Sequence, residues 1–217
     1  MRLIRRAAIG NFAEQHADAL EPLLLWANAV EGSAWKSPED VRRTFRSADF
    51  KGQFTVFDIG TNQYRVIAYV HYARDAVFLA MSPGGIDFDI KRYQRQLART
   101  VPTSIESDDE NNRVLAVIEE LMEKGEDALT PREDAFLDVL VDLVYDFDEI
   151  HHPLPSGEPH KMVSFLLQQG GWTPQDLWPV LGSEGVVSEV LSGELTISGD
   201  QTKALGAFFH VGAWIFR

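Results

Sequence analysis

The sequence contains no cysteine, which excludes disulfide bridges and thiolate metal ligands. It also lacks a run of about 18 apolar residues, the length that a transmembrane helix needs. The first residues, MRLIRRAAIGNF, are basic but are not followed by the apolar stretch of a secretory signal peptide. These absences predict a cytoplasmic protein that does not enter a membrane.

Basic side chains are few. Twenty Lys and Arg stand against 33 Asp and Glu, giving a net charge of −13 and a pI of about 4.8. This balance argues against broad nucleic-acid affinity, which depends on neutralising phosphates. The first 80 residues hold ten basic and nine acidic side chains, and the remainder holds ten and 24. A near-neutral part followed by a strongly acidic part suggests two units of different origin.

Residues 1–80 have the pattern of an α+β domain. A short strand at MRLI precedes helical stretches at 5–16 and 18–31, and a short helix opened by Ser37 carries Arg42, Arg43 and Arg46. The period then changes, because apolar and polar residues alternate in 53–59, 64–72 and 76–81. Three such segments predict helices packed on an antiparallel meander.

The chain after Ser82-Pro83-Gly84-Gly85 has no strand-like segment, so an all-α region is expected there. Capping boxes at Ser107 and Thr130 predict two helices, the second extending to about residue 150. This second helix carries an acidic strip at four-residue spacing, made of Asp134, Asp138, Asp142 and Asp146. The strip is either a solvated face or a surface that docks a basic patch such as Arg42, Arg43 and Arg46.

Residues 173–194, TPQDLWPVLGSEGVVSEVLSGE, predict two short helices around a tight turn. Thr173 and Ser183 are good N-caps, Pro174 suits the first helical position, and Gly182 breaks the first helix. Spacing alone leaves two interpretations open: a helix-turn-helix that reads DNA, or an ordinary helical hairpin.

The C-terminal half resembles a known family over roughly residues 86–217. GSEGVVSEVLSGE followed by LTISGDQTKALGAFFHV is similar to the helix-turn-helix domain of HigA-type antitoxins, a branch of the Cro/C1-like repressors. The resemblance implies operator DNA as a partner, a possible homodimer, and autoregulation of transcription. The DNA-binding candidates that it implies are Thr173, Gln175, Ser183, Glu184, Gly185, Ser188 and Ser192.

Residues 1–80 resemble the partner toxin, HigB, an mRNA interferase with a RelE-like fold. The resemblance rests on MRLI, FAEQHADALEPLLLWANAV, AWKSPEDVRRTFRSADF and VFDIGTNQYRVIAYVHYARDAVFLA. It implies a toxin fused to its antitoxin, with a truncated toxin domain at 1–81, a joint and linker at 82–107, a helical antitoxin region at 108–152 and a helix-turn-helix domain at 153–217. The residual RNA-contact candidates are Lys36, Asn62, Tyr64, Arg65 and His71.

The sequence lacks functional residues of both families, and these differences determine which activities are expected to be lost or weakened. The toxin family's Arg in the last strand aligns with Ala80, and the segment with its His and Tyr is missing, so no intact catalytic set is expected. The antitoxin family's basic positions hold Glu184, Glu194 and Leu195 instead, which predicts weakened DNA binding.

No cofactor is expected, because the sequence has neither a P-loop nor a dinucleotide-binding fingerprint. No metal site is expected either, and His151, His152 and His160 are interpreted as surface residues. Three functions stay open: a DNA-binding regulator that also neutralises toxin, an mRNA interferase restrained by its fused antitoxin, and an interaction protein that binds a related toxin or only packs its own halves together.

Overall fold

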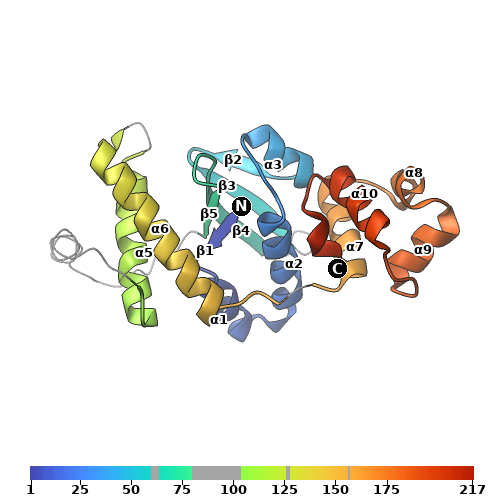
Figure 1. Ribbon diagram of the computed structural model, residues 1–217, viewed down its shortest axis with the longest axis horizontal. Coiled ribbons are helices and arrows are strands. Elements are labelled where there is room, and N and C mark those ends of the chain that lie inside the picture. Colours follow the sequence, from blue (N-terminus) through green and yellow to red (C-terminus); the bar gives the residue numbers. More distant parts are fainter. Residues whose placement is uncertain (60–63, 80–103, 126–127, 156) are drawn as a thin grey trace. The chain divides into compact units, whose positions relative to one another are not determined.

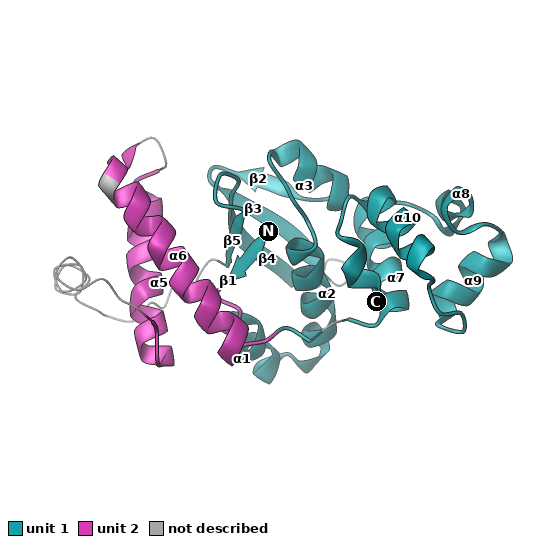
Figure 2. Ribbon diagram, in the orientation of Figure 1, with its two compact units in different colours: residues 1–3, 8–79, 154–217 teal, residues 4–7, 80–153 magenta. Residues whose placement is uncertain are grey.

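The computed structural model describes residues 1–59, 64–79, 104–125, 128–155 and 157–217. These residues form two compact units, shown in Figure 2. The first unit combines residues 1–3, 8–79 and 154–217, and the second combines residues 4–7 with 80–153. Among the described residues, no helix is both long and apolar enough to cross a membrane.

A five-stranded sheet forms the centre of the first unit. Its strands are β1 (Arg2–Ile4), β2 (Asp49–Lys51), β3 (Phe54–Ile59), β4 (Tyr64–His71) and β5 (Ala76–Leu79), in the spatial order β1-β5-β4-β3-β2. The pairs β2–β3, β3–β4 and β4–β5 are antiparallel. The alternating segments of the sequence therefore predict β3, β4 and β5 correctly, whereas the short edge strand β2 carries too few residues to show a period.

Helices α1 (Ala7–Gln15), α2 (Leu20–Glu31) and α3 (Pro38–Thr44), with the 3-10 turn η1 (Ala17–Ala19), accompany the sheet. The face of α2 that carries Trp26 and Val30 is fully buried, and the Trp26 ring meets Phe57 of β3 at 5.4 Å. Leu20 is 40 % exposed, although the helical period places it with the buried residues of α2. The helix begins only at this residue, so its side chain lies beyond the packed turns.

The C-terminal helices complete the first unit (Figure 1). They are α7 (Pro159–Gly170), the 3-10 turn η3 (Pro174–Leu177), α8 (Trp178–Leu181), α9 (Glu184–Ser192), α10 (Gly199–Phe209) and η4 (Ala213–Phe216). These elements agree with the helical stretches expected at 160–169, 174–181, 183–192 and 199–209. Whether they form a Cro/C1-type helix-turn-helix is a separate question, and it stays a prediction.

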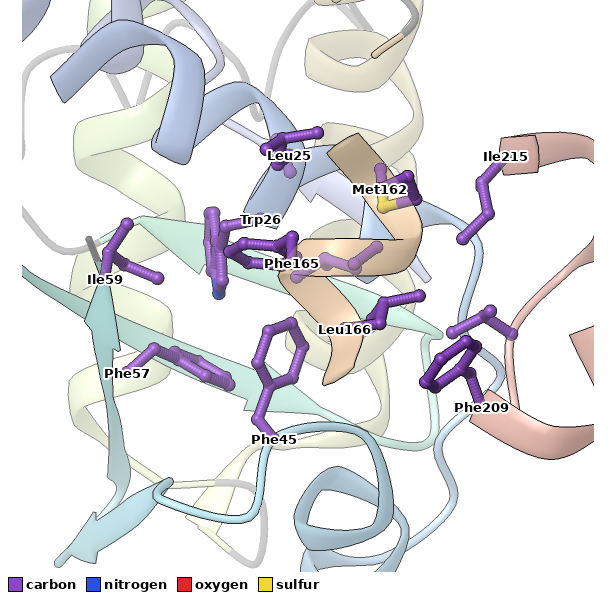
Figure 3. Packing of buried hydrophobic residues seen from close by; sticks show 14 of the residues in the cluster. Leu25, Trp26, Phe45, Phe57, Ile59, Met162, Phe165, Leu166, Phe209 and Ile215 are labelled. Atoms are coloured by element: carbon purple, nitrogen blue, oxygen red, sulfur yellow. The ribbon is translucent and has the colours of Figure 1, made fainter. Parts of the chain in front are cut away.

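One hydrophobic core connects α7 to the sheet, as Figure 3 shows. Phe165 of α7 lies with its ring centre 6.2 Å from that of Phe45, which in turn lies 5.1 Å from Phe57. Leu166 is fully buried in the same cluster. The helix that follows the proline-rich link therefore contributes to the core of the toxin-like sheet.

Backbone hydrogen bonds fix this packing at both ends. The Arg46 amide donates to the Gln169 carbonyl at 3.0 Å, and the Gln169 side chain donates to the Asp58 carbonyl at 3.3 Å. At the other end, the Gly212 amide donates to the Gly32 carbonyl at 2.5 Å. Residues 8–79 and 154–217 thus form one compact unit. The four predicted segments and the different origin of the two parts of the chain stay predictions.

The second unit contains a helical hairpin of α5 (Asp108–Glu123) and α6 (Pro131–His151). Ser107 caps α5 by accepting the Glu110 amide, and Thr130 and Glu133 form the predicted capping box of α6. The two helices bury a shared apolar face that includes Val114, Val117, Ile118, Leu121, Leu137, Leu140, Val141, Val144 and Phe147. Residues 82–103, most of the predicted joint and linker, lie outside the described residues.

Truncating Leu166 to Ala tests the shared core. Loss of a fully buried leucine should lower the free energy of unfolding by about 2–5 kcal/mol. Because α7 and the sheet share this core, far-UV circular dichroism and Trp fluorescence should both shift by the same amount in urea. Ile150→Ala is the control, since Ile150 is 74 % exposed and its truncation should change stability by less than about 0.5 kcal/mol.

The cap of α6 predicts an acid-dependent loss of helix. The Glu133 carboxylate accepts from Lys124 at 2.6 Å and from the Thr130 amide at 2.9 Å, and these bonds lower the pKa of Glu133 to about 2. A lowered pKa means that the stabilisation is present above the ordinary value of 4.5 and is lost as pH falls through about 2. Circular dichroism at 222 nm should therefore decline less between pH 4.5 and 2 in Glu133→Gln, and parallel curves would contradict this account.

Candidate functional site

The RNA-contact candidates of the toxin-like domain are spread over two elements. Tyr64, Arg65 and His71 belong to β4, and Lys36 precedes α3. Side chains alternate across a strand, so Arg65 and His71 lie on one face of the sheet and Tyr64 lies on the other. Asn62 and Ala80 fall outside the described residues. The structure thus separates the four described candidates rather than gathering them on one face.

A carboxylate holds each of the three exposed or half-exposed candidates. The Lys36 ammonium lies 2.6 Å from Asp75, and the Arg65 guanidinium lies 3.1 Å from Asp58 on the neighbouring strand. The Tyr64 hydroxyl donates to Asp18 at 2.7 Å. These three acidic partners were not foreseen from the sequence, because no local pattern connects residues as far apart as Tyr64 and Asp18.

The electrostatics of these contacts disfavour RNA cleavage. The hydrogen bond to Asp18 raises the pKa of the Tyr64 phenol, which makes the phenol a poorer proton donor. His71 is 2 % exposed and lies against the Arg74 guanidinium. Cleavage of RNA needs an acid, a base and positive charge on the phosphate. Here the cations are engaged by carboxylates, and the one histidine candidate is buried.

The DNA-binding candidates lie together at the opposite end of the first unit from the sheet (Figure 1). All seven of the residues implied by the family resemblance are exposed. Gly182, with φ of 119°, ends α8, and Ser183 caps α9 by accepting the Val186 amide at 3.5 Å. Two short helices therefore flank a tight turn, as the sequence predicts, while a DNA-reading role for them stays a prediction.

Hydrogen bonds already occupy some of these hydroxyls. The Thr173 hydroxyl donates to Asp176 at 2.9 Å, and the Thr173 amide donates to the same carboxylate at 2.7 Å, which lowers the pKa of Asp176. The Ser192 hydroxyl donates to the Glu189 carbonyl at 3.1 Å. Both residues therefore stabilise the ends of their own helices.

No Lys or Arg lies in α8, in α9 or in the turn between them. The sequence holds neither Lys nor Arg between Lys161 and Lys203, while Glu184, Glu189 and Glu194 are all exposed. Nucleic-acid backbones are bound mainly by neutralising their phosphates. The negative charge of this surface therefore disfavours DNA binding, although the arrangement of its helices suggests it.

The acidic strip of α6 is exposed at all four positions: Asp134, Asp138, Asp142 and Asp146. Its expected partners lie in the other compact unit, where Arg42 lies over the Phe50 ring at 4.7 Å and Arg43 pairs with Asp40 at 3.0 Å. Docking of the strip on these arginines stays a prediction.

The histidines near the proline-rich link have structural contacts. His151 stacks on Phe147 with ring centres 4.0 Å apart, His152 lies 3.1 Å from Asp108, and His160 lies 3.4 Å from Glu158. Over the residues described, no three His, Asp or Glu side chains gather in a way that could hold a metal ion.

One further acidic residue, Asp148, is not among the residues that the sequence motifs single out. Asp148 is fully buried, and it accepts hydrogen bonds from the backbone amides of Arg5 and Arg6. A signal for it exists in the sequence. Asp148 follows Val144 by four residues and Val141 by seven, so the helical period puts this carboxylate on the apolar face of α6. An acid at such a position needs a buried partner.

Comparison with known proteins identifies the sheet-containing part. Residues 19–81 match the family model of HigB, described as the RelE-like toxic component of a toxin-antitoxin system. The chain is also 24 % identical, over 100 residues, to "mRNA interferase HigB" of Escherichia coli. That alignment covers 44 % of this chain and 97 % of the relative.

That alignment includes 44 % of the 217 residues, about 95, so it continues past residue 81. The end of a truncated toxin domain at residue 81 stays a prediction. Residues 19–81, with the sheet and helices that they form, are a HigB-like domain of the RelE-like toxins.

Proposed function

We propose that the chain is a toxin–antitoxin fusion that acts as a DNA-binding regulator and keeps its own HigB-like domain bound. In this proposal the C-terminal helices are a HigA-like helix-turn-helix domain, and the HigB-like domain does not cleave RNA. Operator DNA is the proposed partner of α8 and α9, with a second copy of the chain as the proposed dimer partner.

The observation that carries the proposal is that the C-terminal helices have one packed side and one exposed side. One side, formed by α7 and η4, packs on the HigB-like domain through Phe165 and the Gly212–Gly32 hydrogen bond. The other side, with α8 and α9, stays exposed. A domain that holds a toxin-like partner with one face and leaves its helix-turn-helix open is suited to binding both.

The charge of α9 sets the expected strength. A recognition helix that contains Glu189 and is followed by Glu194 repels phosphates, so binding should be weak and confined to low salt. Hydroxyl and amide side chains such as Ser188 and Gln175 can still donate to bases or phosphates. The proposal is therefore a weak regulator rather than a tight repressor.

A second candidate function is an mRNA interferase restrained by the fused helices. The observation in its favour is that the alignment covers nearly the whole length of a protein named mRNA interferase. The contacts of Lys36, Tyr64 and Arg65 with carboxylates weigh against it. The two functions differ in the nucleic acid they engage and in whether it is cut.

Gel-shift titration with DNA from upstream of the gene should detect retarded complexes at about 50 mM salt that vanish by about 200 mM. Glu189→Lys/Glu194→Lys should tighten binding and make the slope of log K against log [salt] steeper by about two. These lysines lie near the C-terminal end of α9, where positive charge suits the helix dipole.

Glu106→Lys/Glu123→Lys is the matched control. It changes the net charge by the same amount on the α5–α6 hairpin, so it should leave the salt slope unchanged. Absence of any retarded band at low salt, for the wild type and for the α9 variant alike, would sink the DNA-binding proposal.

Incubation of the purified full-length chain with mRNA, with and without translating ribosomes, should leave the RNA intact. The full chain is required because residues 1–79 alone lack the core contacts of Phe165 and Leu166. Primer extension would detect cleavage. Cuts that disappear in His71→Ala would establish the restrained interferase instead.

A further inference from the structure

The second compact unit contains more than the α5–α6 hairpin. It includes Ile4–Ala7, the short segment that connects β1 to α1. Four residues from one end of the sequence are thus bound by helices that begin more than a hundred residues later.

The backbone of this segment is bound by a single carboxylate. One oxygen of Asp148 accepts from the Arg5 amide at 2.8 Å and from the Arg6 amide at 3.1 Å. Arg5 has φ of 70°, in the left-handed region. This conformation turns two successive N–H groups to the same side and creates a concave anion-binding nest. The Asn111 amide, 3.4 Å from the other oxygen, orients the carboxylate.

The side chains of the segment are bound separately. Glu119 of α5 lies 2.7 Å from the Arg5 guanidinium, and Glu149 of α6 lies 2.6 Å from that of Arg6. The Arg6 guanidinium also lies over the Tyr145 ring at 5.0 Å. The two arginine side chains are only 10 % and 2 % exposed. We call Glu119, Tyr145, Asp148 and Glu149 the arginine cradle.

The cradle is specific in a way that an apolar contact is not. Burial raises the pKa of Asp148, and the two amide hydrogen bonds oppose that shift. A buried carboxylate such as Asp148 is costly unless its partners are in place. A different residue type at Arg5 or Arg6 would also remove the cation from Glu119 or Glu149, whose side chains are 40 % and 51 % exposed. The hairpin therefore discriminates both the backbone shape and the two positive charges.

We infer that the α5–α6 hairpin is a receptor for a dibasic segment of a toxin-like chain, a segment that Arg5 and Arg6 supply here in cis. The inference rests on the proposed function, since it names the part of the toxin that the antitoxin-like half recognises. The partner that fits the cradle in trans is a toxin-like chain with two consecutive arginines between its first strand and first helix.

Limited proteolysis of the full-length chain tests the contact itself. Trypsin should cut after Arg5 and Arg6 at least about tenfold faster in Asp148→Ala than in the wild type, because two buried amides lose their acceptor and the segment opens more often. Asp146→Ala removes an exposed carboxylate from the same helix. Trypsin should cut this variant at the wild-type rate. Equal rates in the two variants would overturn the inference.

A peptide experiment tests recognition in trans. Arg5→Pro cannot adopt the left-handed conformation or donate its amide, so it should empty the cradle of the full-length chain. Fluorescently labelled peptide MRLIRRAAI should then bind Arg5→Pro at least tenfold more tightly than the wild type, whose cradle is filled. Peptide MRLIPRAAI is the matched control probe.

The peptide experiment has one result that supports the cradle and two that overturn it. Binding that is abolished in Arg5→Pro/Asp148→Ala supports the cradle, and binding equal in all chains or for both peptides overturns it. If Arg5→Pro does not fold, the trypsin comparison decides. Neither readout involves DNA or RNA, so failure of the cradle and failure of the proposed DNA-binding function are distinguishable.

Discussion

Packing of α7 against the toxin-like sheet is the interaction on which the rest of the first unit depends. Trp26, Phe45 and Phe57 form an aromatic cluster that Phe165 and Leu166 close from the other side. Without α7 these rings would face water, at roughly 25 cal/mol for each Å² of apolar surface exposed. The C-terminal helices are consequently part of the same compact unit as the HigB-like domain.

Several basic side chains pair with carboxylates of the same chain. The basic side chains that a ribonuclease would turn toward a phosphate are held here by Asp75 and Asp58, and the dibasic segment is held by Glu119 and Glu149. The exposed pairs of Lys36 and Arg65 each add little stability. Their larger effect is on function, because a cation beside a carboxylate attracts a nucleic acid far less than a free one.

Local patterns predicted much of the fold. The alternation in β3 and β4 and the caps at Ser107, Thr130 and Ser183 are determined by residues a few positions apart, and the structure reproduces them. Pairings across long separations were not predictable. Nothing near Asp148 indicates that its partners are Arg5 and Arg6. Likewise, nothing in α7 indicates that it packs on α2 and α3 rather than only on its own helical neighbours.

The candidate sites likewise have features that local sequence predicts and features that depend on distant residues. The two short helices α8 and α9 and the turn between them followed from caps and breakers in the sequence. The acidic partners of Lys36, Tyr64 and Arg65 did not, because they come from other loops and strands. The cradle could be predicted only in part. The helical period places Asp148 on an apolar face of α6, but it does not identify the groups that Asp148 binds.

The separation of 143 residues between Arg5 and Asp148 has a consequence for synthesis on the ribosome. The N-terminal segment emerges first, yet its acceptor leaves the exit tunnel only after most of the chain has been translated, and α7 follows later still. Neither compact unit can close before then, since contacts this distant in sequence form only when both partners exist. A nascent HigB-like domain therefore never completes its core ahead of α7.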